Sequence, residues 1–274
     1  CDIADGSEFV CGIGTLDAAA KAAGVPIIAG VSSVTALSGA VVRALSGGMR
    51  RVQSVEMAIS ASNRASAGPA VVAAVLSQIG QAFVRDESDS AGAGAERLYG
   101  WQSARRLTFH VAGARALRGR SVFLVDVPDV HLLPSRLPGS PKVTFRAGTE
   151  LEFQNWALWA LSWPVRWGII GNLGPWAKAL LPLQNLTQRW GGLRSAMIVR
   201  VAGEDASGAV ERNWTLIADQ GDGPRIPALS VPVLVRHMVA GKVAAGARDG
   251  GGELDLTDYA EAFGRIAVRH GVTE

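Results

Sequence analysis

A short, continuously apolar segment between two helical patterns constrains the fold of this chain most strongly. Residues 24–30 have the sequence GVPIIAG, whose apolar side chains do not alternate with polar ones, as in a strand covered on both faces of a parallel sheet. A helix is expected before it, from Leu16 to Ala23, with Gly24 as its C-cap. A second helix is expected after it, through Val41. This order predicts an α/β domain.

The loop that follows this strand, GVSS, contains Gly30, Val31, Ser32 and Ser33. Open α/β sheets bind their ligands at the carboxyl ends of the strands, which makes these four residues candidates for cofactor binding. A serine in this position can equally be the N-cap of the next helix. Both interpretations remain open at this point.

The pattern changes after Gly47 and Gly48, where residues 51–60 have the composition of a strand. Residues 1–47 and 48–274 are therefore expected to form separate units. In the second unit, alternating residues on both sides of the turn EDASG predict a hairpin over 195–219. A helix is expected at 70–80, a polar loop at 86–96, and a C-terminal helix with Thr257 as its N-cap.

Composition excludes several classes of protein. Among 274 residues, 48% are hydrophobic and 19% are charged, which excludes an intrinsically disordered chain. Two cysteines, Cys1 and Cys11, are too few for a disulfide framework or a four-cysteine zinc site, so a reducing, cytoplasmic location is expected. A net charge of +3 is too small to indicate nucleic-acid binding.

Two segments carry residues that are suited to chemistry. Between Leu98 and Val125 there are several arginines, including Arg105 and Arg106, and no acidic residue. Their planar guanidinium groups could bind a phosphate or a dicarboxylate, or they could form a solvated hairpin face.

The second segment, residues 121–134, is a predicted buried strand that runs into Asp126, Asp129 and His131. These side chains could move protons, or they could close the loop by hydrogen bonds. No second cluster of ligands stands near them, so no metal site is expected.

Six of the eight tryptophans lie between 156 and 190. Trp156, Trp159, Trp163 and Trp167 are spaced by three, four and four residues, which places them on one face of a helix within the Trp-rich segment 153–190. Pro164, the segment 171–175 and Pro182 are expected to break this region into pieces too short to span a bilayer. The tryptophans could pack on the sheet of the domain, form a surface for self-association, or make peripheral contact with a membrane.

No GxGxxG, P-loop, HExxH, GxSxG or kinase motif occurs in the sequence. Residues 1–42 nevertheless resemble the closing half of the dinucleotide-binding domain of saccharopine dehydrogenase-like oxidoreductases. Later segments are similar to the second domain of bacterial members of that family: SVEMAISASNRA, LYGWQ, FLVDVPDVHLLP, VTFRAGTELEF, NWTLIADQGDGPRIPA and LTDYAEAF.

The resemblance implies the C-terminal part of a Rossmann dinucleotide-binding domain over 1–47, followed by an α+β domain with a mixed sheet over 48–274. The expected cofactor is NAD or NADP, and the glycine-rich loop of the family would lie upstream of Cys1. The second domain would bind a small-molecule substrate and form a homodimer. The expected reaction is hydride transfer.

Under the same resemblance, Asp129 and His131 would handle protons. Arg64, Arg105 and Arg106 would bind anionic groups of the substrate, and the segment 30–33 would face the nicotinamide. The Trp-rich segment suits an apolar substrate better than a charged one, so saccharopine itself is not the expected substrate. The alternative is a non-catalytic interaction or membrane-docking module on a degenerate Rossmann scaffold.

Overall fold

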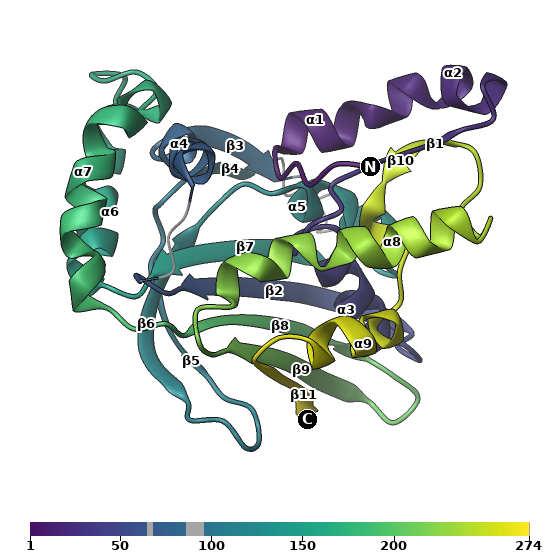
Figure 1. Cartoon of the computed structure of the whole chain (residues 1–274). Helices are drawn as coiled ribbons and strands as arrows, with labels where there is room; N and C mark the ends of the chain where they lie inside the picture. The colour runs from purple at the N-terminus through teal and green to yellow at the C-terminus, as the bar shows by residue number, and fades with distance from the viewer. Residues whose placement is uncertain (65–67, 86–95, 274) are drawn as a thin grey trace.

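The computed structural model of this chain describes residues 1–64, 68–85 and 96–273. It is a mixed α/β structure built around a curled seven-stranded sheet (Figure 1). Its strand order is β11-β9-β8-β2-β7-β6-β5, in which β2 and β7 are parallel and the other neighbours are antiparallel. The expectation of a mixed sheet in an α/β chain is therefore confirmed.

The strands of this sheet are β2 (Arg51–Ala61), β5 (Arg105–Phe109), β6 (Leu117–Leu124), β7 (Lys142–Thr149), β8 (Ser195–Glu204), β9 (Ala209–Ala218) and β11 (Val268–Thr273). The hairpin predicted over 195–219 is β8 and β9, paired from Ser195 and Ala218 to Glu204 and Ala209. The turn between the two strands is the predicted EDASG segment.

The two faces of the sheet differ because side chains alternate along each strand. On β2, Val55 and Met57 belong to the main hydrophobic core, which also contains Leu37 of α3 (Ala36–Ser46) and Leu234 of α8 (Ser230–Val239). The intervening Glu56 belongs to the other face, where it lines a pocket. In Figure 1, α8 and α9 (Ala260–Gly264) lie across the core side of the sheet.

The N-terminal unit comprises α1 (Ser7–Gly12), α2 (Asp17–Ala22) and β1 (Pro26–Ala29). Its strand β1 pairs in parallel with β10 (Gly246–Asp249), from Pro26 opposite Gly246 to Ala29 opposite Asp249. The predicted strand is thus present, and its partner comes from near the C-terminus of the chain. The division at residue 47 stays a prediction.

The Trp-rich segment forms α6 (Glu152–Arg166) and α7 (Ala177–Thr187), on the opposite side of the molecule from α1 and α2 (Figure 1). Beside them lie the helix α4 (Pro69–Gln78) and the hairpin of β3 (Ala82–Arg85) and β4 (Glu96–Tyr99). The short helix α5 (Pro128–Leu132) follows β6. The polar loop expected at 86–96 lies almost wholly outside the described residues.

Short 3-10 helices complete the description: η1 (Ile13–Leu16), η2 (Pro134–Arg136), η3 (Gly174–Trp176), η4 (Gln188–Trp190), η5 (Gly223–Ala228), η6 (Gly250–Gly252) and η7 (Leu256–Tyr259).

The Trp-rich segment is divided into short pieces as predicted, because α6 ends at Arg166, two residues after Pro164, and α7 begins at Ala177. Pro182 lies inside α7 and does not end it, so this part of the prediction was wrong. One capping prediction was also wrong. The C-terminal helix is capped by Asp255, whose carboxylate forms a capping box with Asp258, and not by Thr257. Thr257 lies inside the first turn, which is a 3-10 turn.

Candidate functional site

The loop over 30–35 leaves β1 at the carboxyl end of the parallel strand pair. Gly30 has a φ of 69°, in the left-handed region that favours glycine. A Cβ at this position would lie 3.1 Å from Cγ1 of Val10 in α1. Val31 and Thr35 form an isolated antiparallel bridge, so the loop folds back on itself.

The serines of this loop are buried and do not cap the following helix. Ser32 is 0% exposed and Ser33 is 5% exposed. The N-cap of α3 is Thr35, which makes no side-chain capping bond, so the interpretation of a serine cap is wrong. The hydroxyl of Thr35 has no hydrogen-bond partner within the described residues. The hydroxyl of Ser32 faces Asp5: burial raises the pKa of Asp5, and interaction with this hydroxyl partly opposes that shift.

Asp129 belongs to α5, and its carboxylate contacts the start of α3. Its Oδ2 accepts a hydrogen bond from Oγ of Ser38 at 2.5 Å and another from the amide of Thr35 at 3.2 Å. The side chain is 1% exposed. Burial raises the pKa of Asp129 to about 6 although both hydrogen bonds favour the carboxylate. Asp129 therefore contacts Thr35 and Ser38, just beyond the segment 30–33 that was predicted to bind a cofactor.

His131, the other predicted catalytic residue, pairs with Asp126. Its Nε2 lies 2.7 Å from Oδ1 of Asp126, the residue between β6 and α5. Both side chains are partly exposed, at 30% and 25%. The segment predicted as a polar pocket thus has a buried acid and a solvent-accessible His–Asp pair.

The second strand of the parallel pair also ends in a polar contact that was not predicted. Asp249, the last residue of β10, forms a two-point ion pair with Arg136, with N–O distances of 2.7 and 2.5 Å. Burial alone would raise the pKa of Asp249, but the hydrogen bonds and charge of Arg136 hold it below the usual range. The segment from α5 through η2 thus contacts the carboxyl ends of both β1 and β10.

The structure does not bring together the three arginines predicted to bind substrate. Arg64 donates to the carbonyl of Arg189 at 3.3 Å. Arg105 pairs with Glu56 on the sheet face opposite the main core. Arg106 donates to the carbonyl of Gly119 within the β5–β6 hairpin, and neighbouring strand residues point to opposite sides. Their assignment to one substrate stays a prediction.

The tryptophans of α6 lie on one face, as predicted, and form a ladder of ring contacts. Trp156, Trp159, Trp163 and Trp167 follow one another with centroid distances of 5.5, 5.9 and 5.5 Å. The ladder begins at the buried Phe123, whose ring meets Trp156 at 5.5 Å. It ends at Trp167, which is 65% exposed, and Trp156 itself is 46% exposed. Trp159, between them, packs against the core cluster that contains Phe123. The ladder is therefore only partly buried.

Sequence reasoning missed a cavity of about 280 Å³ on the polar face of the sheet, whose lining includes Arg105, Thr144 and Arg146. A smaller pocket beside it includes Arg200. The signal was present in the sequence, because a polar residue at every second position of a strand marks one face. Residues 142–146 have the sequence KVTFR, with Lys142, Thr144 and Arg146 in this pattern.

Neither a family model nor a curated protein matches the sequence. Within residues 1–64, 68–85 and 96–273, no helix is both long and apolar enough to cross a bilayer. In the same ranges, histidine, cysteine and acidic side chains do not gather in threes that could hold a metal ion.

Proposed function

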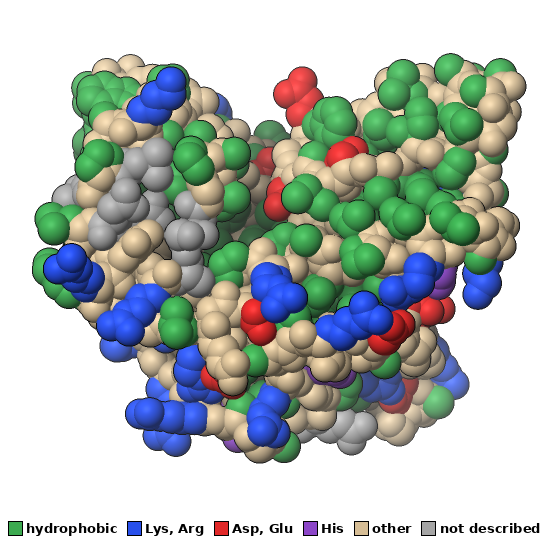
Figure 2. Space-filling view, in the orientation of Figure 1, with side chains coloured by type: hydrophobic (Ala, Val, Ile, Leu, Met, Phe, Trp, Pro, Cys, Tyr) green, Lys and Arg blue, Asp and Glu red, His purple; other side chains and the backbone are tan. Residues whose placement is uncertain are grey.

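We propose that this chain is part of an NAD(P)-dependent oxidoreductase related to the saccharopine dehydrogenases, with a substrate other than saccharopine. One observation carries this proposal: the carboxyl ends of two adjacent parallel strands meet a polar helix, which is where open α/β sheets bind ligands. Figure 2 shows a notch in the surface above α5, between the region of α4 and that of α1, with acidic side chains beside it.

The residues of the loop suit one end of a dinucleotide. The buried hydroxyl of Thr35 lacks a partner within the described residues, so a ligand with a carboxamide group could satisfy it. Asp2 lies against this loop, with its carboxylate accepting from the amide of Gly30 at 3.2 Å. A ligand that reaches Ser32 would therefore lie next to Asp2. Residues 30–33 would hold the nicotinamide end, and the bound cofactor would supply hydride transfer.

The chain itself would supply proton handling and orientation. A pKa of about 6 lets Asp129 hold or release a proton near neutral pH. Because Asp129 is almost fully buried, it acts through Ser38 and the amide of Thr35, and positions the loop. His131 and Asp126 are the groups in this segment that can pass a proton to solvent.

The proposal is tested by titrating the full-length protein, with the expected glycine-rich loop included, with NADH and NADPH and following cofactor fluorescence. One of the two cofactors should bind with a micromolar dissociation constant, and Ser32→Val should weaken that binding at least roughly tenfold by removing a buried hydroxyl partner. Ser46→Ala, on the far end of α3, is the matched control and should bind like the wild type. Absence of binding for both cofactors would refute the proposal.

A second candidate function, docking to a membrane surface, is favoured by the exposed tryptophans. Trp176, at 57% exposed, and Trp190, at 66% exposed, join Trp167 at the surface, and tryptophan is enriched at the membrane–water interface. Trp167→Ser should then reduce flotation with anionic liposomes without lowering thermal stability. Val239→Ser, at an 85% exposed position of α8, is the control. Flotation that is equal in both variants, or absent in the wild type, would exclude docking through this surface.

A further inference from the structure

The polar face of the seven-stranded sheet carries an arginine cluster that neither the proposed active site nor the main core uses. In the register of the sheet, Glu56 of β2 lies opposite Arg200 of β8, and Ala58 of β2 lies opposite Arg146 of β7. Their neighbours along the strands, among them Met57, belong to the main core on the other face. We call this surface the basic groove, lined by Glu56, Arg105, Thr144, Arg146 and Arg200.

Arg146 is buried and forms no ion pair with a carboxylate among the described residues. Its side chain is 8% exposed, and it donates a long hydrogen bond from Nη1 to Oγ1 of Thr144 at 3.4 Å. Its Nε is inaccessible to solvent and makes no hydrogen bond within the described residues. Burial lowers the pKa of Arg146 and the nearby Arg105 lowers it further, while the charge of Glu56 opposes this shift without reversing it. A desolvated cation without a partner is costly in free energy, so an anion that binds there would remove an existing penalty.

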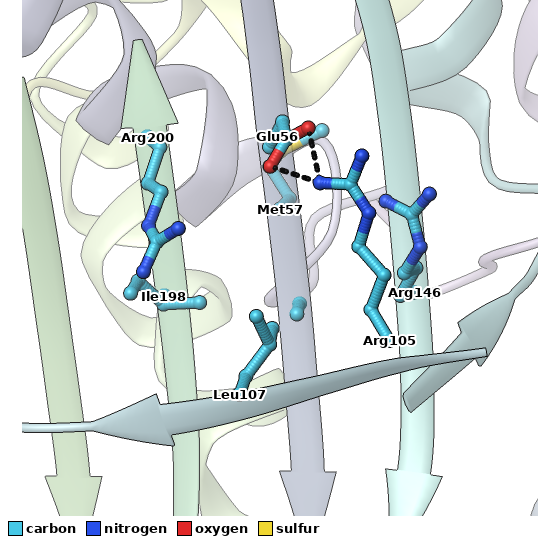
Figure 3. A pocket seen from close by; sticks show the side chains of 8 residues that line it. Glu56, Met57, Arg105, Leu107, Arg146, Ile198 and Arg200 are labelled. Carbon is cyan, nitrogen blue, oxygen red and sulfur yellow. Dashed lines mark hydrogen bonds and ion pairs between the residues drawn. The ribbon is translucent and has the colours of Figure 1, made fainter. Parts of the chain in front are cut away.

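The neighbouring cations make the groove strongly positive. Figure 3 shows the guanidinium groups of Arg146 and Arg105 side by side, with Arg200 on the other side of β2. Arg105 is paired with Glu56, at 2.7 and 3.0 Å. Arg200, like Arg146, forms no recorded ion pair in the part of the chain that the structure describes, and its Nε is buried without a partner. The lining of the two adjoining pockets contains five cationic side chains and two carboxylates.

We propose that the basic groove binds the oxyanion group, carboxylate or phosphate, of a small molecule through Arg146 and Arg200. Arginine presents paired N–H donors that match such groups. Arg146 lines the cavity of about 280 Å³, and Arg200 lines the small pocket that adjoins it. The volume of the cavity is near the lower end of the range for small-molecule sites, roughly 300 to 1,000 Å³. It therefore suits a small organic acid or a phosphorylated metabolite of similar size.

This site is independent of the proposed oxidoreductase function, because it lies on the opposite face of the sheet from Asp129 and the loop over 30–35. Failure to bind NAD(P)H would leave the proposed anion site unaffected. Conversely, a groove that binds no anion would leave the cofactor proposal standing. A negative result in the NAD(P)H titration and a negative result in the anion titration can therefore be told apart.

The test is calorimetric titration of the protein with inorganic phosphate and, separately, with succinate, at constant ionic strength. At least one probe should bind, and the probe that binds more tightly identifies the preferred group. Arg146→Met should raise its dissociation constant by roughly ten- to a hundredfold, as expected for loss of a charge-assisted hydrogen bond. Arg118→Met, an exposed arginine of β6 outside both pockets, should bind like the wild type.

A thermal readout separates this role from a structural one. Without anion, Arg146→Met should melt at the same or a higher temperature than the wild type, because a buried unpaired charge is removed. With anion, only the wild type and Arg118→Met should gain stability. If Arg146→Met does not fold, Arg200→Met should show the same loss of binding.

Three results would overturn the proposal. The first is a wild-type protein that binds neither probe at roughly millimolar concentration, the range of weak binding. The second is equal affinity in the wild type and both groove variants. The third is a dimer in sedimentation that Arg146→Met converts to a monomer, since a carboxylate of a second copy would then be the partner of Arg146.

Discussion

Replacing Asp129 by asparagine tests whether burial outweighs two hydrogen bonds at the start of α3. Burial raises the pKa of Asp129 from 3.8 to about 6, so the folded protein binds this proton more tightly than the unfolded chain does. Stability from this group is therefore full below the unfolded pKa and is lost as pH rises through the folded pKa. At about 1.4 kcal/mol per pH unit, the carboxylate form costs about 3 kcal/mol above neutral pH.

Asparagine keeps an oxygen for Ser38 and the amide of Thr35 but carries no charge. Asp129→Asn should therefore be more stable than the wild type by about 3 kcal/mol near pH 8. The two should be equal near pH 3, about one unit below the unfolded pKa, because Asp129 is then protonated in both the folded and the unfolded state. Urea denaturation at both pH values measures this difference, and all other titrating groups cancel in the comparison. A difference that does not depend on pH, or an asparagine variant that is less stable near pH 8, would refute the reasoning.

Two further substitutions test the packing around the same helix. Gly39→Ala should destabilise the protein by about 1–3 kcal/mol in urea denaturation, because the new Cβ would lie 2.5 Å from the carbonyl oxygen of Gly251. Gly264→Ala, with no atom within 4 Å of the new Cβ, is its control; an equal effect of both changes would contradict the steric explanation. Tyr259→Phe should cost about 1 kcal/mol through loss of the buried 2.8 Å hydrogen bond between its hydroxyl and Ser230, and unchanged stability would show that this bond contributes nothing.

Local patterns predicted the elements of the fold well where one physical signal dominated. The apolar run before Gly30 gave a buried parallel strand, and alternation on both sides of EDASG gave the β8–β9 hairpin. The spacing of the tryptophans placed their rings on one face of α6. The partner of β1 was not predictable, because β10 lies more than two hundred residues later and is only four residues long. Strand pairing over such a separation depends on tertiary packing.

The candidate sites were predictable in residue type but not in arrangement. Asp129 was expected in a polar pocket, yet its contact with Thr35 joins residues 94 positions apart, and no local pattern encodes that distance. Arg146 stands in a strand whose alternation marks one polar face, and such a face is usually solvated. Its burial arises because the curled sheet and β5 enclose that face. Desolvation by burial is the main cause of the shifted pKa of both Asp129 and Arg146. Desolvation is produced by the fold as a whole, so titration and anion binding can reveal these groups where sequence patterns cannot.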